Sequence, residues 1–94
     1  MPPKTPAPTT RLRHAKKAAW RKVADEAVIL DCETAHYFSL EGCGRRAWEL
    51  LDGRSPDEAA GLLAGEFDAA DGVIRRDVRE LAARLWAEGL LEPA

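Results

Sequence analysis

The sequence predicts a single α+β domain in which helices cover one face of a small antiparallel sheet. Apolar residues alternate with other residues along positions 28–40, as they do in short strands. Positions 44–88 instead carry apolar residues three or four apart, as helices do. A chain of 94 residues is long enough for one domain with a modest core.

Three short strands are expected, and the second and third are the best marked. Val28 and Leu30 alternate with Ile29 and Asp31, and residues 36–40 repeat this alternation. The segments ADEA (24–27) and CETA (32–35) supply the turns between the strands. A first strand near residues 20–24 is weakly marked.

The first two helices are marked by their ends. The first is expected over residues 44–51, with Gly53 as a stop. The second begins at the sequence SPDE, in which Ser55 is an N-cap, Pro56 takes the first helical position and Glu58 closes a capping box. It is expected to run to about residue 66 and to bury Ala59, Leu62 and Leu63.

The third helix is the longest. Asp68 or Asp71 is expected to cap its start, and Gly89 is expected to end it in a left-handed conformation after Glu88. Leu90 then fits the hydrophobic contact that often accompanies such a cap. Five apolar residues recur at helical spacing along this helix: Ile74, Val78, Leu81, Ala82 and Leu85.

The N-terminal segment differs from the rest of the chain in composition and charge. Residues 1–22 contain seven Lys or Arg and no acid, a charge of +7, whereas the remaining residues are at −9. The opening MPPKTPAPTT has little apolar surface to bury, and RLRHAKKAAW lacks a cap and a clear apolar stripe. We therefore expect residues 1–19 to form a disordered, solvated tail and residues 20–94 to form the folded domain.

The sequence EGCG at residues 41–44 is the first candidate for a reactive site. Gly42 and Gly44 have G-x-G spacing, but no third glycine follows at the spacing of a phosphate-binding loop. Cys43 as a nucleophile would need a base, and His36 is the only histidine in the predicted folded part. No third, orienting group is identifiable, so we interpret this segment as the corner between a strand and a helix.

The other polar residues show no catalytic or metal-binding pattern. The 16 carboxylates are scattered over the helices, and no pair lies in an apolar setting that would raise a pKa for acid catalysis. Two cysteines and two histidines are too few for a disulfide scaffold or a four-ligand zinc site. Neither an apolar run of 18 residues nor a secretory signal is present. We expect a cytoplasmic protein that is not an enzyme and needs no membrane, metal or cofactor.

A winged-helix nucleic-acid binder is the main alternative, because strands and three helices are the parts of a winged helix-turn-helix. Its best feature is the +7 segment, which could bind nucleic acid or an acidic partner non-specifically. The predicted folded part is acidic, however, and the arginines of the third helix are interleaved with acids. Since phosphate contacts supply much of the affinity, this charge argues against DNA or RNA binding.

The strand at residues 36–40 is a better functional candidate. An edge strand of so small a sheet presents unpaired backbone groups, to which a peptide can add as a further strand. Alternation places Tyr37 and Phe38 on opposite faces. Phe38 and Leu40 are expected to pack in the core, whereas Tyr37 fits packing and peptide binding about equally well.

Three segments of the chain occur in a characteristic order: LDCETAHYFSL, GRRAWELLDG and DVRELAARLWAEGLL. Together they resemble the PqqD-like family, the peptide-recognition domains of pathways that modify ribosomally made peptides. LDCETAHYFSL resembles the family hairpin LD-x-x-T-G-x-Y-Y-x-L-N, and GRRAWELLDG resembles its helix G-x-x-I-W-x-L-L-x-G. DVRELAARLWAEGLL resembles the last helix, D-V-x-x-F-L-x-x-L-x-x-x-G-L-L, and the whole resemblance covers about residues 23–92. Ala35 replaces the family's turn glycine, Glu41 its asparagine and Ala47 its isoleucine. Because Gly and Asn tolerate left-handed backbone, Ala35 and Glu41 predict a locally different turn.

The resemblance implies a winged helix-turn-helix-like fold, with a three-stranded antiparallel sheet packed on three helices. It also implies that the leader of a precursor peptide binds as a strand added to the third strand, in a groove between that strand and the last helix. The peptide-binding strand would consist of His36, Tyr37, Phe38, Ser39 and Leu40. The opposite wall would consist of Ile74, Asp77, Val78 and Leu81.

The resemblance further implies a function without catalysis. Such domains hand the bound peptide to a modifying enzyme or a leader protease. This chain looks most like the leader-recognition component of a lasso-peptide pathway, whose partner is a cysteine-protease component. A peptide chaperone for a radical S-adenosylmethionine enzyme is the nearest alternative.

Overall fold

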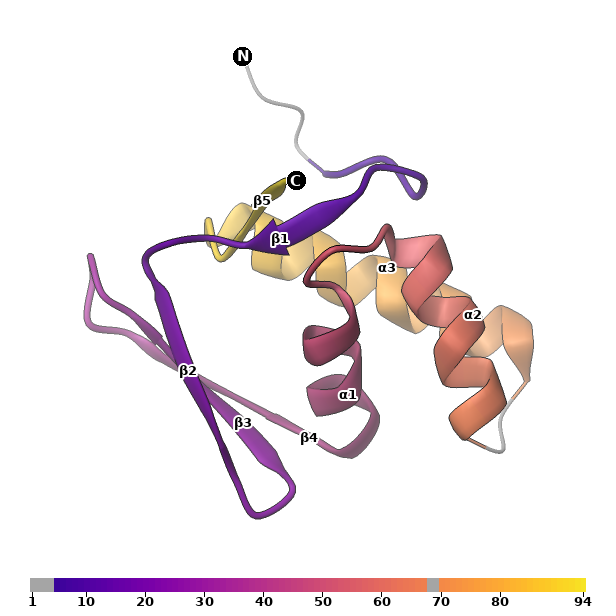
Figure 1. Cartoon of the computed structure of the whole chain (residues 1–94), viewed down its shortest axis with the longest axis horizontal. Coiled ribbons are helices and arrows are strands. Elements are labelled where there is room, and N and C mark those ends of the chain that lie inside the picture. Colours follow the sequence, from indigo (N-terminus) through magenta and orange to yellow (C-terminus); the bar gives the residue numbers. More distant parts are fainter. Residues whose placement is uncertain (1–4, 68–69) are drawn as a thin grey trace.

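The protein forms a three-stranded antiparallel sheet packed against three helices, as predicted (Figure 1). The computed structural model describes residues 5–67 and 70–94, with the backbone alone at residue 71. The sheet has the order β2 (Ala18–Val23), β3 (Glu26–Asp31) and β4 (Tyr37–Glu41). The helices are α1 (Gly42–Leu50), α2 (Pro56–Glu66) and α3 (Asp71–Ala87), and α1 lies between the sheet and the other two helices (Figure 1).

The sheet turns one face to the helices. On β3, Ala27 and Ile29 are fully buried, whereas the alternate residues Val28 and Leu30 are only half-buried. Leu40 of β4 is buried on the same face as Ile29, as the two-residue alternation of a strand requires. The predicted strands are thus confirmed, and the weakly marked first strand begins two residues earlier than expected.

The turn between β3 and β4 corrects one prediction. Ala35 has φ +62°, so it adopts the left-handed conformation that the family's glycine would favour. The expectation that Ala35 would change the turn is therefore wrong, and the chain carries the strain of a Cβ there. Glu41 is extended, at φ −115°, and the left-handed conformation falls on Gly42 at φ +53°.

The start of α2 and the end of α3 follow the sequence signals closely, whereas α1 (Gly42–Leu50) begins two residues before its predicted start. The hydroxyl of Ser55 accepts from the Glu58 N–H (3.1 Å), and the Ser55 N–H donates to the Glu58 carboxylate (3.0 Å), so the capping box is confirmed. Gly89 has φ +73° and ends α3 as predicted. Leu62 is 45% exposed, however, so its predicted burial is wrong, because it lies on the outward side of α2.

The start of α3 also differs from the prediction. The residue before the helix is Ala70, which provides no side-chain cap, and residue 71 is the first helical residue. Asp71 is therefore not the N-cap, and Asp68 lies outside the described residues.

The N-terminal segment is the largest departure from expectation. β1 (Leu12–His14) pairs antiparallel with β5 (Leu91–Pro93), and Leu12 is fully buried. The Leu12 N–H also donates to the carbonyl of Arg54 (3.1 Å). The prediction of a disordered tail through residue 19 is therefore wrong for residues 12–19, and residues 1–4 lie outside the described part of the chain.

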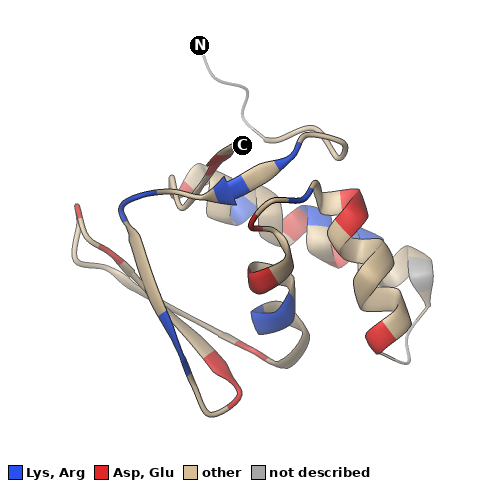
Figure 2. Cartoon of the chain, viewed as in Figure 1, with Lys and Arg blue, Asp and Glu red and all other residues tan. Residues whose placement is uncertain are grey.

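Ion pairs join the basic segment to the domain. Arg11 lies 3.6 Å from Glu58, Arg13 donates to Glu92 (2.9 Å), and Lys17 lies 3.0 Å from the buried carboxylate of Asp31. The basic β1 lies beside the acidic part of β5 (Figure 2). The +7 segment and the −9 remainder thus neutralise each other in part within one molecule.

An aromatic cluster joins this segment to the core. The ring of His14 stacks on that of Trp48, with centroids 3.6 Å apart and planes 5° apart, and Trp20 meets both rings edge-on. His14 Nε2–H donates to the carbonyl of Trp48 (2.7 Å). Burial lowers the pKa of His14, against the opposing effects of this carbonyl and of Asp52. β1, β2 and α1 are therefore fixed to one another by these three rings.

Candidate functional site

The free edge of β4 is the first part of the candidate site. β4 pairs with β3 on one side and is the last strand of the sheet. The Asp31 N–H donates to the His36 carbonyl (2.9 Å), and hydrogen-bonded pairs alternate along an antiparallel ladder. The backbone groups of Phe38 and Leu40 therefore face β3, whereas those of Tyr37 and Ser39 face the open edge.

The side chains of β4 divide in the complementary way. Tyr37 is 70% exposed on the outer face, and the Ser39 hydroxyl beside it donates to the Glu26 carboxylate (2.9 Å). Phe38 is half-buried and packs against the core on the inner face, as predicted. His36 precedes the strand, its N–H donates to the Thr34 hydroxyl (3.3 Å), and its side chain is exposed.

An apolar hollow between α1 and α3 is the second part of the site. It has a volume of about 240 Å³. The α3 wall contains all four residues predicted for it: Ile74, Asp77, Val78 and Leu81. The α1 wall contains three residues that were not predicted to line it: Cys43, Gly44 and Ala47.

The hollow adjoins the inner end of β4 without being lined by it. A Cβ placed on Gly44 would lie 3.8 Å from the Cβ of Leu40, so the C-terminal end of β4 packs directly behind the α1 wall. None of residues 36–40 lines the hollow itself. The two halves of the predicted site are therefore neighbours rather than one continuous surface in the described residues.

One flank of α3 is available and the other is occupied. Arg79 forms two hydrogen bonds to Asp57 of α2, at 3.1 and 3.2 Å, so this flank lies against α2. Asp77 and Leu81 lie on the opposite flank and line a second shallow hollow of about 270 Å³ with Glu80 and Arg84. The side of α3 that lines the hollow between α1 and α3 is thus apolar at its centre and charged at its rim.

The surroundings of the Cys43 thiol disfavour its thiolate form. Burial raises the pKa of Cys43, and the nearby carboxylates of Asp77 and Glu66 raise it further. A raised pKa lowers the fraction of thiolate, which is the reactive form. Among residues 5–67 and 70–94, no group of three or more His, Cys, Asp or Glu side chains is arranged to hold a metal ion. No helix in the same residues is both long and apolar enough to cross a membrane.

The fold and the site define a class of small α+β domains, in which a free sheet edge lies next to an apolar hollow between helices. The family model for coenzyme PQQ synthesis protein D (PqqD) matches residues 26–91. This match covers most of the chain, and the protein belongs to the PqqD family.

Solved structures of similar fold agree with this assignment. TbiB1 in complex with the TbiA(beta) leader peptide is 30% identical, with a TM-score of 0.78 over 85% of this chain and 94% of that one. Lasso peptide synthetase B1 complexed with the leader peptide is 25% identical, with a TM-score of 0.73 over 88% and 99% of the two chains.

A third solved structure is also similar to this chain. The PqqD truncation of Methylobacterium extorquens PqqCD, a stand-alone recognition element for ribosomally synthesized and post-translationally modified peptides, is 25% identical. Its TM-score is 0.68 over 86% of this chain and 87% of that one. No curated protein matches this chain.

Proposed function

We propose that this protein is a non-catalytic domain that binds the leader region of a ribosomally made precursor peptide as a strand added to β4. The single observation that carries this proposal is the open edge of β4, which ends beside the apolar hollow of α1 and α3. Backbone pairing would supply affinity, and the hollow would select side chains. Two solved structures of similar fold are complexes with leader peptides, which supports a leader peptide as the ligand here.

The predicted peptide-binding residues take distinct roles in this proposal. Tyr37 and Ser39 offer their outward backbone N–H and C=O groups to the peptide. His36 contributes its exposed side chain at the start of the strand. Phe38 and Leu40 support the inner face, on which alternate peptide side chains would lie.

The wall of α3 receives the apolar side chains of the peptide. Ile74 and Val78 form its buried floor, and Leu81 is half-buried at its margin. Asp77 stands at the rim, where its carboxylate is more than half exposed and lies 3.6 Å from Arg76. We propose that Ala47 sets the depth of the hollow, because a larger residue at this position would fill it.

The bound peptide is delivered to a maturation enzyme in the cytoplasm, where ribosomes release the precursor. A lasso-type pathway with a cysteine-protease component is favoured, because lasso peptide synthetase B1 in complex with its leader peptide is similar to this chain over most of its length. A radical S-adenosylmethionine enzyme is the alternative partner. The raised pKa of Cys43 supports a role without covalent catalysis.

The ion pairs of the basic segment argue against nucleic-acid binding. Arg11, Arg13 and Lys17 of the basic segment are engaged with acids of the same molecule. These pairs would have to break before the segment could neutralise phosphates, and phosphate contacts supply most non-specific affinity.

The test is a titration of the full chain with two ligands, each at two salt concentrations. One is a fluorescent peptide with the leader sequence of a lasso-peptide precursor; the other is duplex DNA. We expect saturable peptide binding that changes little with salt, since backbone pairing is uncharged, and weak DNA binding. Tight, salt-steep DNA binding without peptide binding would overturn the proposal.

A further inference from the structure

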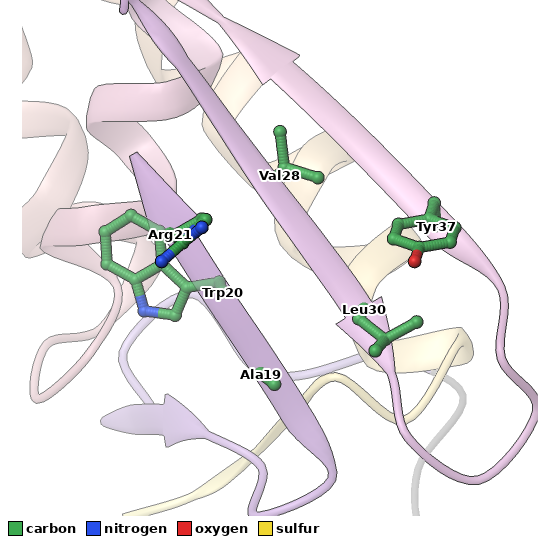
Figure 3. A pocket seen from close by; sticks show the side chains of 6 residues that line it. All are labelled: Ala19, Trp20, Arg21, Val28, Leu30 and Tyr37. Carbon is green, nitrogen blue, oxygen red and sulfur yellow. The ribbon is translucent and has the colours of Figure 1, made fainter. Parts of the chain in front are cut away.

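The outer face of the sheet, turned away from the helices, carries an apolar patch. The strand register places Ala19, Leu30 and Tyr37 in one row across the three strands, and Arg21 and Val28 in the next. These five residues, here called the outer patch, line a hollow of about 250 Å³ together with Trp20 (Figure 3).

The fold does not require apolar residues there. An antiparallel sheet that is packed on one side normally has polar residues on its other side. Val28 and Leu30 instead lie between Arg21 and Tyr37 (Figure 3), on the side of the sheet away from the three helices (Figure 1). Tyr37 is 70% exposed, and Val23, further along β2 on the same face, is 48% exposed. A contiguous apolar surface of this kind marks an interaction site.

The charge of the outer patch indicates what its partner carries. Within residues 5–67 and 70–94, the guanidinium of Arg21 forms no hydrogen bond or ion pair, although most other arginines of the domain are paired with acids. Its guanidinium stands at the border of the apolar side chains (Figure 3). A partner that buries these side chains therefore needs a carboxylate opposite Arg21.

The size and position of the outer patch indicate which partner this is. Five side chains are far fewer than the roughly 20–30 residues that each side of a stable protein interface contributes. The patch reaches the free edge of the sheet at Tyr37, so a peptide strand added to β4 would continue the same face with every second side chain. A protein that covers both the patch and the peptide has a larger interface than either offers alone.

We infer that the outer patch is the docking surface for the maturation enzyme that acts on the bound peptide. This inference rests on the proposed function, since the peptide strand completes the surface. The enzyme presents an apolar area with a carboxylate that meets Arg21. Because the peptide is part of the interface, enzyme and peptide each raise the affinity of the domain for the other.

Charge reversal at two adjacent positions tests the inference. Arg21 and Lys22 are neighbours on β2, both exposed, and alternation turns them to opposite faces of the sheet. The probe is a cysteine-protease component of a lasso-peptide pathway, the partner proposed above, immobilised and titrated with the full chain, with and without the precursor leader peptide. Peptide binding by each variant is measured separately by fluorescence anisotropy.

We expect Arg21→Glu to weaken enzyme binding about tenfold or more, because like charges then face each other across the interface. Lys22→Glu makes the same change in net charge and should bind the enzyme as the wild type does. Both variants should bind the peptide normally, and peptide should tighten enzyme binding by the wild-type chain. Val28→Thr, which keeps the strand shape but makes the patch more polar, should also weaken enzyme binding.

Three outcomes would overturn the inference. Equal enzyme binding by Arg21→Glu and the wild type would exclude the outer patch as the docking surface. Loss of self-association in Arg21→Glu, seen by sedimentation with no change in enzyme binding, would make a second copy of the chain the occupant. Absence of enzyme binding by the wild type would exclude this partner. Absence of peptide binding by the wild type would instead overturn the proposed function, and the enzyme titration without peptide would still test the patch.

Discussion

Ser39→Pro is the sharpest test of strand addition to β4. The register turns the Ser39 N–H toward the open edge, so proline removes a donor that the sheet itself does not use. The same substitution at Phe38 would break the ladder to β3. Ser39→Pro should therefore leave the domain folded while removing one backbone bond to the peptide.

The expected effect follows from that single bond. A peptide carbonyl that is buried against β4 without its donor costs about 1–3 kcal/mol. This corresponds to an increase of about 5- to 150-fold in the Kd for the leader peptide. The substitution also removes the hydrogen bond from the Ser39 hydroxyl to Glu26, which Ser39→Ala removes as well, so the alanine variant isolates the backbone effect.

The assay is fluorescence anisotropy with labelled leader peptide, and the midpoint of thermal unfolding reports folding. Lys22→Pro is the matched control, because the same register logic turns its N–H toward the opposite edge, that of β2. We expect normal peptide binding by Ser39→Ala and Lys22→Pro and weak binding by Ser39→Pro. If folded Ser39→Pro bound the peptide as tightly as Ser39→Ala, the edge of β4 would not be the binding site.

Three further predictions concern the turn, the hollow and the core. Ala35→Gly should raise the free energy of unfolding by up to about 1 kcal/mol in urea titrations, because it relieves the strain of a Cβ in the left-handed conformation. The larger conformational entropy of glycine in the unfolded chain offsets only part of this gain. Ala47→Leu should fill the hollow and weaken peptide binding by about 1.5–3 kcal/mol, the burial of one aliphatic side chain, as measured by anisotropy. The lowered pKa of His14 favours its neutral form in the folded state. The contribution of His14 to the free energy of unfolding should therefore be fully present above a pH of about 6.5 and should be lost as the pH drops toward the folded-state pKa. In urea titrations at several pH values, His14→Phe should reduce this dependence of stability on pH.

Each of these predictions has a result that contradicts it. A less stable Ala35→Gly would mean that chain entropy outweighs the strain at φ +62°. Unchanged affinity in a folded Ala47→Leu would mean that no peptide side chain enters the hollow. An equal pH slope in His14→Phe and the wild type would assign the acid sensitivity to other groups.

Local structure could be predicted well because its signals lie within a few residues of where they act. The capping box of Ser55 and Glu58, the left-handed Gly89 and the alternation of β3 each depend on neighbours in the chain. The prediction of α3 also placed Ile74, Val78 and Leu81 on one face, and all three line the hollow.

The N-terminal segment could not be predicted, because what orders it is distant in the sequence. β1 has three residues, too few for a pattern, and it pairs with residues 91–93. Leu12 is a single apolar residue among basic ones, and it becomes buried only when β1 pairs with β5 and bonds to the loop at Arg54. Arg13 and Glu92 form an ion pair, but they are far apart in the sequence, so the local composition around either residue does not predict it.

The sequence alone determined the α+β class, the order of the three-stranded sheet and the three helices, and the strand whose edge is the candidate site, because period, capping and turn residues act over short distances. Only the tertiary structure decided which backbone groups of β4 face outward, since that depends on pairing with β3. It also decided that α2 occupies one flank of α3, that Ala47 leaves a hollow on the other, and that Arg21 and Tyr37 border one exposed surface. These features arise where residues far apart in the chain meet, and packing in three dimensions is what brings them together.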